Sequence, residues 1–159
     1  MKQLKFQFII IVFLLAIFSA CDKSRVFDEF KSLPKSGWNK DSLVVFTIPV
    51  TDTLQNHNLY INVRNDVSYS FSNLWLFIEI DQPGGKALKD TFELSLADPT
   101  GKWLGEGMGG KKTRQVIYRR NVYFPVSGNY KIKLQQGMRE TNLKGISDIG
   151  IRIENAGSN

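Results

Sequence analysis

The sequence is poor in the residues that build disulfide bonds and metal sites, with one cysteine and one histidine among its 159 residues. No disulfide bond can form within the chain, so packing and hydrogen bonds alone must hold the fold, even in an oxidising compartment. A structural zinc site needs several cysteine or histidine ligands. We therefore expect no metal or other cofactor, and we place His57 in a solvated turn between Asn56 and Asn58.

Long apolar segments are also missing, because the longest one, from Phe8 to Phe18, is shorter than the roughly 20 residues that a membrane-spanning helix needs. It follows Lys2 and Lys5 and precedes Ser19-Ala20-Cys21, which is the layout of a secretion signal. A cysteine directly after small residues is typical of bacterial lipoproteins, in which the thiol receives a diacylglycerol and the freed amine a further acyl chain. We predict a signal peptide over residues 1–20 and lipidation at Cys21. The alternative is an ordinary secretory signal followed by a free thiol, which an exported protein rarely carries without a reason.

The excess of positive charge is small. The formal charge of +6 includes Lys2 and Lys5, so removal of the signal leaves 19 basic residues against 15 acidic ones. This balance is well short of the basic footprint of a nucleic-acid-binding domain, and we expect no nucleic-acid partner. It suits a protein held near an anionic membrane surface. The 139 remaining residues amount to about one domain and can bury a proper core.

Apolar residues alternate with polar ones through most of the mature chain, which is the signature of half-buried strands. Turn residues separate the segments, and a stretch resembling a turn or two of helix occurs only at 137–144. We predict an all-β protein with one antiparallel β-sandwich or jelly-roll domain of about eight strands over residues 44–159. A lipidated N-terminus and tether over 21–43 precedes it, in which 26–30 forms a short strand or a helical turn. The alternating segments are 44–50, 59–64, 74–80, 92–96, 116–124, 130–134 and 149–153.

One glycine-rich segment matches part of the sequence pattern of a nucleotide-binding loop. Gly105–Lys111 satisfies G-x-x-x-x-G-K, but Lys112 stands where a phosphate loop has Ser or Thr. A phosphate loop also opens a helix, whereas Arg114–Phe124 alternates as a strand. We interpret the segment as a flexible hairpin connection between two strands.

Carboxylates on neighbouring strands can pair in the manner of a glycosidase. Outward-facing charges are the ordinary role of such residues on strands, so we predict that the protein is not an enzyme. The carboxylates in question are Glu79, Asp81, Asp90 and Glu93.

The densest basic cluster consists of Lys111, Lys112, Arg114, Arg119 and Arg120. It has two possible roles. Either it faces lipid headgroups, an acidic partner or an anionic glycan, or it lies on a solvated edge strand and its charge prevents aggregation there; we favour the edge strand.

Among the tryptophans, we expect Trp75 in the core. Trp103, flanked by Gly101 and Gly105, is either a stacking platform or a corner residue that closes one end of a sandwich, and we favour the corner.

Several phrases along the chain together resemble the gliding-motility lipoproteins of the GldH type, from Bacteroidetes. The resemblance covers nearly the whole mature chain. It implies a cell-envelope lipoprotein needed for surface gliding, acting with other gliding lipoproteins and the linked type IX secretion apparatus. It brings no catalytic residues. The phrases are Cys21-Asp22, Trp38–Asp41, Asn58–Asn65, Tyr69–Leu74, Leu96–Asp98, Gly101–Gly105, Gly128–Tyr130, Met138-Arg139 and Leu143–Gly150.

Two classes of function follow, and fold alone does not choose between them. One is a non-enzymatic structural or assembly component, anchored by lipid with its domain in the periplasm; the other is a lipid-anchored glycan-binding module. Exposed aromatic residues in a row would favour a sugar, whereas an apolar or charged patch of interface size would favour a protein. Trp103 and Arg139 are our candidate partner contacts, because both lie in segments that present side chains without breaking a strand ladder. The sequence leaves open which membrane holds the anchor and which small molecule, if any, is bound.

Overall fold

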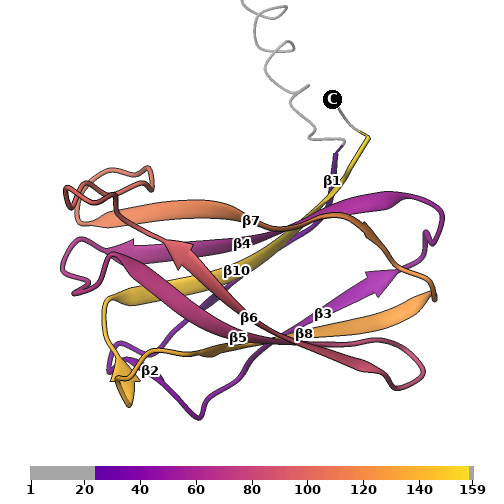
Figure 1. The fold of residues 1–159 in the computed structure, drawn as a ribbon, viewed down its shortest axis with the longest axis horizontal. Helices are drawn as coiled ribbons and strands as arrows, with labels where there is room; N and C mark the ends of the chain where they lie inside the picture. Colours follow the sequence, from indigo (N-terminus) through magenta and orange to yellow (C-terminus); the bar gives the residue numbers. More distant parts are fainter. Residues whose placement is uncertain (1–23, 158–159) are drawn as a thin grey trace, which may run out of the picture.

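The computed structural model describes residues 24–157, and the predicted lipidation site Cys21 lies outside them. The described chain is all-β, as predicted, and folds into two four-stranded sheets and one two-stranded sheet (Figure 1). The strands are β1 (Arg25–Ser32), β2 (Trp38–Asn39), β3 (Val44–Val50), β4 (Asn56–Asp66), β5 (Asn73–Asp81), β6 (Ala87–Ser95), β7 (Lys111–Tyr123), β8 (Gly128–Gln136), β9 (Asn142–Leu143) and β10 (Ile146–Asn155). Strands β3 to β10 lie within residues 44–159, where the sequence predicted about eight, and β1 and β2 precede them. Two of the ten strands, β2 and β9, have only two residues each.

The strand order is that of a jelly roll. One sheet runs β1-β10-β4-β7 and the other β3-β8-β5-β6, and all neighbouring strands are antiparallel. Of the main strands, only β5 and β6 are consecutive in the chain and paired in one sheet, so the chain passes repeatedly from sheet to sheet. The short pair β2-β9 lies beside them. Residues 137–144, where the sequence predicted a helical turn, form a loop and β9, and no helix occurs in residues 24–157.

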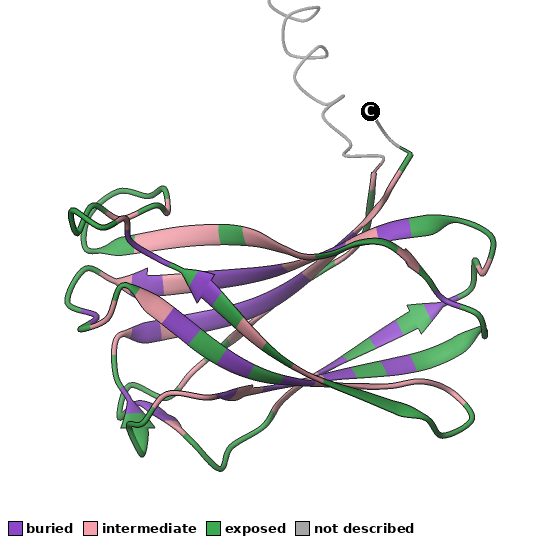
Figure 2. Cartoon of the chain, viewed as in Figure 1, coloured by how far each residue is buried: buried purple, intermediate pink, exposed green. Residues whose placement is uncertain are grey.

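The core lies between the two sheets and is built from the alternating apolar residues that the sequence predicted. Ile61 and Val63 of β4 and Ile151 of β10 are buried on one side, and Leu76 and Leu134 on the other. Figure 2 shows the consequence, because buried and exposed residues alternate along β3 and β5. Each of these aliphatic side chains stabilises the fold by about 1.5–3 kcal/mol on full burial.

The sandwich begins earlier than the sequence predicted. Residues 25–32, expected in a tether, form β1, which pairs with β10 from Arg25 opposite Glu154 to Ser32 opposite Asp148. The predicted boundary at residue 44 is therefore wrong. An edge strand buries its inner face only partly, so it can carry charge there: Lys31 donates from Nζ to the carbonyl of Val45 at 2.6 Å. Such a strand shows little apolar alternation in its sequence.

The sandwich has two ends with different loops. The end at which the described chain begins, here called the proximal end, carries the chain termini at 24–26 and 155–157 and the loops 51–55, 82–86 and 124–127. These loops lie to the right in Figure 1, and the chain termini leave the body at its upper edge, right of centre. The opposite, distal end carries the loops 33–43, 67–72, 96–110 and 137–145. In residues 24–157 the structure contains no helix that is long and apolar enough to cross a bilayer.

Candidate functional site

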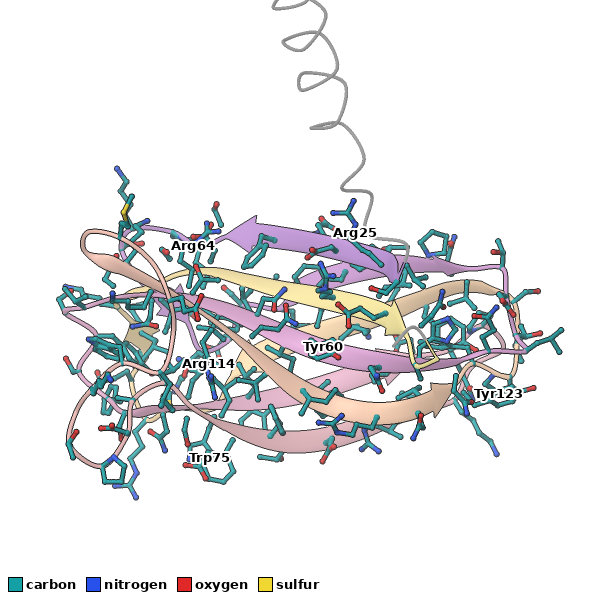
Figure 3. The ribbon with its side chains drawn as sticks, turned by 90° about the horizontal axis from the view of Figure 1, so that it is seen from above. Arg25, Tyr60, Arg64, Trp75, Arg114 and Tyr123 are labelled. Carbon is teal, nitrogen blue, oxygen red and sulfur yellow. The ribbon has the colours of Figure 1, made fainter. Side chains whose placement is uncertain are left out.

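Two aromatic side chains lie exposed on the outer face of β5. Trp75 is 38% exposed and Phe77 is 50% exposed, and both share this face because they are two residues apart in a strand. The prediction that Trp75 lies in the core is therefore wrong. Leu74 and Leu76 of the same strand face inward and are fully buried. In Figure 3, Trp75 lies at the margin of the body, at the opposite end from Tyr123.

The loop that follows β8 is fixed against these aromatic residues. Gly137 donates its backbone N–H to the Trp75 carbonyl at 2.7 Å, and the Trp75 N–H points at Met138 Sδ at 3.4 Å. The buried Gln136 shapes the loop, because its Oε1 accepts from Met138 N–H at 2.8 Å and its Nε2 donates to the Glu140 carbonyl at 2.7 Å.

This fixed loop holds Arg139 in solvent immediately after Met138. We call Trp75, Phe77, Met138 and Arg139 the aromatic shelf. A Cβ atom on Gly137 would lie only 3.3 Å from Trp75 Cβ and 3.4 Å from the Phe77 ring, so glycine lets the loop approach the shelf closely. The shelf is at the distal end, since β5 starts and β8 ends there.

A hollow of about 570 Å³ continues from Phe77 across the outer face of the same sheet. Lys133 Nζ lies 2.7 Å from Glu79 Oε1 and 2.7 Å from Asp81 Oδ2. Lys133, together with Lys89, lowers the pKa of Glu79. The hollow is lined by Leu43, Phe77, Ile78, Glu79, Lys89, Asp90, Thr91, Lys133 and Gln135.

The remaining carboxylates also have partners. Arg119 Nη2 lies 2.7 Å from Asp90 Oδ2, and this hydrogen bond, with one from Tyr118, lowers the pKa of Asp90. Glu93 accepts a hydrogen bond from Asn73 at 2.6 Å. A general acid in a glycosidase needs a raised pKa, which is the opposite of the shift at Glu79 and Asp90. Among residues 24–157, no three His, Cys, Asp or Glu side chains come together as ligands for a metal ion.

Trp103 is a half-buried corner residue, as expected. It forms an isolated bridge with Ala97, packs against the core, and is followed by a hydrogen bond from Leu104 N–H to the Leu96 carbonyl at 2.8 Å. Trp103 follows β6 and Arg139 follows β8, and β5 lies between those strands. In the described chain no hydrogen bond or ion pair joins Trp103 to Arg139. The shelf therefore includes Arg139, which is carried by the loop fixed to Trp75, and does not include Trp103.

His57 is buried, which corrects the prediction of a solvated turn residue. It belongs to β4, in phase with the inward-facing Leu59 and Ile61, and its ring centroid is 5.3 Å from that of Phe124. Burial lowers its pKa from the ordinary 6.5. The sequence contained a signal for this burial. When the alternating pattern that includes Leu59 is extended two residues toward the N-terminus, it places His57 on the inner face.

The basic cluster of the sequence does not form one surface. Lys111 and Lys112 lie at the distal start of β7, whereas Arg119 and Arg120 lie toward its proximal end, about 23–30 Å away at the rise of a strand. Arg114 is half-buried and donates to the Leu104 carbonyl at 3.4 Å. The glycine-rich segment 105–110 leads into β7 rather than into a helix, in agreement with the rejection of a phosphate loop. It does not form the expected hairpin, because β6 and β7 belong to different sheets.

Comparison with known proteins agrees with the resemblance seen in the sequence. The sequence profile of the GldH lipoprotein family matches residues 25–153. The chain belongs to the GldH lipoprotein family. It is 43% identical over 156 residues to the gliding motility lipoprotein GldH homolog of Christiangramia forsetii, covering 94% of this chain and 95% of that protein. It is 39% identical over 159 residues to the gliding motility lipoprotein GldH of Flavobacterium johnsoniae, covering 96% and 98%.

Among solved structures, latent dimeric PorU from Porphyromonas gingivalis matches 86% of this GldH-family chain and 14% of its own length, at 12% identity. Its TM-score of 0.34 is too low to support a functional link. Membership of the GldH family supports a membrane-anchored lipoprotein of the cell envelope that is associated with gliding motility.

Proposed function

We propose that the protein is a non-enzymatic structural component of the gliding machinery and of the linked type IX secretion apparatus. In this proposal lipid on Cys21 anchors the chain with its domain in the periplasm, and the aromatic shelf contacts another envelope protein. The observation that carries the proposal is the exposure of Trp75 and Phe77 at the distal end, next to the fixed loop that carries Arg139.

The composition of the shelf suits a protein interface. Trp and Arg are enriched among the residues that contribute most to protein–protein binding, and they act best near apolar side chains that exclude water. Phe77 supplies that apolar surface beside Trp75, and the half-buried Met138 contacts the Trp75 backbone immediately before Arg139. The ion pairs of Lys133 with Glu79 and Asp81 provide a polar rim.

The shelf is already ordered without a partner. The buried Gln136 side chain and the hydrogen bond from Gly137 to Trp75 fix the loop that carries Arg139. Binding therefore immobilises few additional groups, which lowers its entropic cost. Trp103, at the same end, presents the exposed part of its ring as a second contact in this proposal.

The first test uses Trp75→Ala and Arg139→Ala in cells whose own copy of the gene is deleted. Both side chains face solvent, so the variants should fold normally, yet spreading on surfaces and cross-linking to the partner should fall. Truncation of an interface hot spot costs about 2 kcal/mol or more, which corresponds to at least about a 30-fold weaker contact.

Met108→Ala is the matched control, because Met108 is an apolar distal residue that is 97% exposed and outside the shelf. Trp103→Ala should lower the melting temperature as well as gliding, since that ring packs against the core. Normal gliding and cross-linking in both shelf variants would contradict the proposed contact. A deletion strain that glides and secretes normally would contradict the functional role itself.

Glycan binding is the second candidate, and the row formed by Trp75 and Phe77 is the observation that favours it. Aromatic side chains beside a hollow with polar groups such as Thr91 and Gln135 suit a small ligand with an apolar ring face and hydroxyl groups. Saturable binding of the purified protein to envelope glycans, lost in Phe77→Ala, would replace the protein-contact proposal.

A further inference from the structure

We propose that the proximal end of the sandwich lies directly against the membrane, with the tips of the loops 51–55 and 124–127 in contact with lipid. This inference rests on lipidation of Cys21, which is part of the proposed function. It adds a membrane-docking surface and a defined orientation of the whole domain.

The first support is the length of chain between the predicted anchor and the sandwich. Only Asp22 and Lys23 separate Cys21 from Ser24. An extended chain spans at most about 3.6 Å per residue, so the three steps from Cys21 to Ser24 keep the two Cα atoms within about 11 Å. Ser24 is fixed to the body, because its carbonyl accepts from Asn155 N–H at 2.9 Å and β1 begins at the next residue. The headgroup layer is itself several ångströms thick, so a lipid on Cys21 holds the proximal end at headgroup level.

The second support is a set of apolar tips that face solvent at this end. Leu54 is 89% exposed, in a turn where Asp52 Oδ1 accepts from Leu54 N–H at 2.8 Å and from Gln55 N–H at 3.4 Å. Val126 is also exposed, in a loop held by a hydrogen bond from Tyr130 Oη to the Val126 carbonyl at 2.9 Å. Both tips are ordered loops, and both lose apolar exposure if they enter lipid.

These tips belong to one surface. Tyr123 at the end of β7 pairs with Asn56 at the start of β4, so the loops on either side of this pair are neighbours. Tyr123 is exposed, and a tyrosine ring suits the boundary between lipid and water. Val26, at the start of β1, is exposed and shares a hollow with Asp52, Gln55 and Phe124.

The third support is the charge around a cleft at the same end. The cleft has a volume of about 660 Å³ and opens between the edge strands β6 and β7. Its lining includes Lys86, Arg119 and Arg120 and contains no carboxylate. Asp90 pairs with Arg119, whereas Lys86 and Arg120 take part in no ion pair among the described residues. Cations in such a position favour an anionic headgroup surface.

The carboxylates near this end do not oppose the attraction strongly. Asp81 is paired with Lys133 and Glu154 with Arg152. Asp52 accepts hydrogen bonds from the backbone of its own turn and keeps its charge, so of these three carboxylates it is the one that repels an anionic surface. With the proximal end on the membrane, the aromatic shelf at the distal end points away from the bilayer, where a partner can reach it.

The test places a fluorescent probe on the lipidated full-length protein in vesicles of phosphatidylethanolamine and phosphatidylglycerol that contain a nitroxide-labelled lipid. Cys21 is the only cysteine in the sequence, and its sulfur is alkylated in the lipidated protein, so an introduced cysteine is the sole free thiol. Leu54→Cys and Val126→Cys report on the proximal end. Met108→Cys, an exposed apolar residue of the distal end, is the matched control.

We expect nitroxide quenching and a blue-shifted emission at positions 54 and 126, and neither at position 108. Lys86→Gln combined with Arg120→Gln should reduce the quenching at position 54, and so should replacement of phosphatidylglycerol by a zwitterionic lipid. Equal signals at positions 54 and 108 in protein shown by mass spectrometry to carry lipid would overturn the docking surface while leaving the shelf proposal intact. Absence of lipid on Cys21 would overturn the docking surface together with the anchoring part of the proposed function.

Discussion

At the scale of single residues, polar side chains that are withdrawn from solvent make the fold sensitive to pH in two separate ranges. Burial lowers the pKa of His57, against the opposing charge of Asp52. Burial by itself would raise the pKa of Asp148, but hydrogen bonds from Ser32 and Ser147 and the charge of Arg64 lower it overall. Protonation of His57 therefore changes the stability of the fold below about pH 6.5, and protonation of Asp148 changes it only in more acidic solution.

We predict that the folded state loses stability as the pH falls from about 6.5 toward the lower pKa of His57 in the folded protein. Above 6.5 His57 is neutral in both states and contributes no pH dependence. Below 6.5 the unfolded chain binds a proton that the folded protein resists, so unfolding becomes more favourable. Urea midpoints at pH 7.5 and 5.5 should differ more for the wild type than for His57→Gln. An equal difference in both proteins would show that His57 does not carry the effect.

At the scale of elements, β1 is held on the sandwich by the close approach of β10. Gly150 of β10 lies between Phe30 of β1 and Asn62 of β4 in the register of the sheet. A Cβ atom there would lie 2.8 Å from the Glu29 carbonyl oxygen and 3.0 Å from the Phe30 ring. The aromatic ring of β1 can cover its neighbour only because that neighbour has no side chain.

We predict that Gly150→Val forces β1 away from β10 and destabilises the protein by about 1–3 kcal/mol, the usual cost of overpacking. Gly110→Val is the matched control, since a Cβ atom at Gly110 would meet nothing within 4 Å. Thermal unfolding of the two variants measures the difference. A melting temperature of Gly150→Val equal to that of the control would mean that β1 accommodates the side chain.

At the scale of the whole molecule, the two ends of the sandwich have different proposed functions. The proximal end carries the link toward Cys21, and the distal end carries the aromatic shelf. Eight strands of a jelly roll connect them, so a contact made at one end is held at a fixed distance from the membrane. This rigidity suits a structural part better than a loosely tethered binding domain.

We predict that Cys21→Ala yields an uncleaved or soluble protein that cannot support gliding, although its folded domain is unchanged. Each acyl chain contributes about 0.8 kcal/mol per buried methylene group, and stable anchoring needs two or more lipid chains or other signals. Fractionation of cells and mass spectrometry of the N-terminus measure the loss, and the melting temperature of the purified domain provides the control. Normal processing and membrane fractionation of the variant would exclude Cys21 as the anchor.

The sequence by itself determined the all-β class, the family, and most of the inward-facing residues. Strands such as β3 and β8 bury one face, so their apolar residues must recur at every second position. Only part of the aromatic shelf could be predicted from the sequence. Met138-Arg139 was found as a non-strand segment able to present side chains, but nothing local connected it with Trp75.

Only the tertiary structure decided which face of β5 is buried, because both of its faces are apolar and periodicity cannot rank them. The opposite sheet covers Leu74 and Leu76 and leaves Trp75 and Phe77 in solvent. In the same way, β1 could not be recognised from residues 25–32, since its place in the fold depends on hydrogen bonds to β10, more than a hundred residues later in the chain. Alternation shows which side chains share a face, whereas burial depends on what distant parts of the chain pack against it.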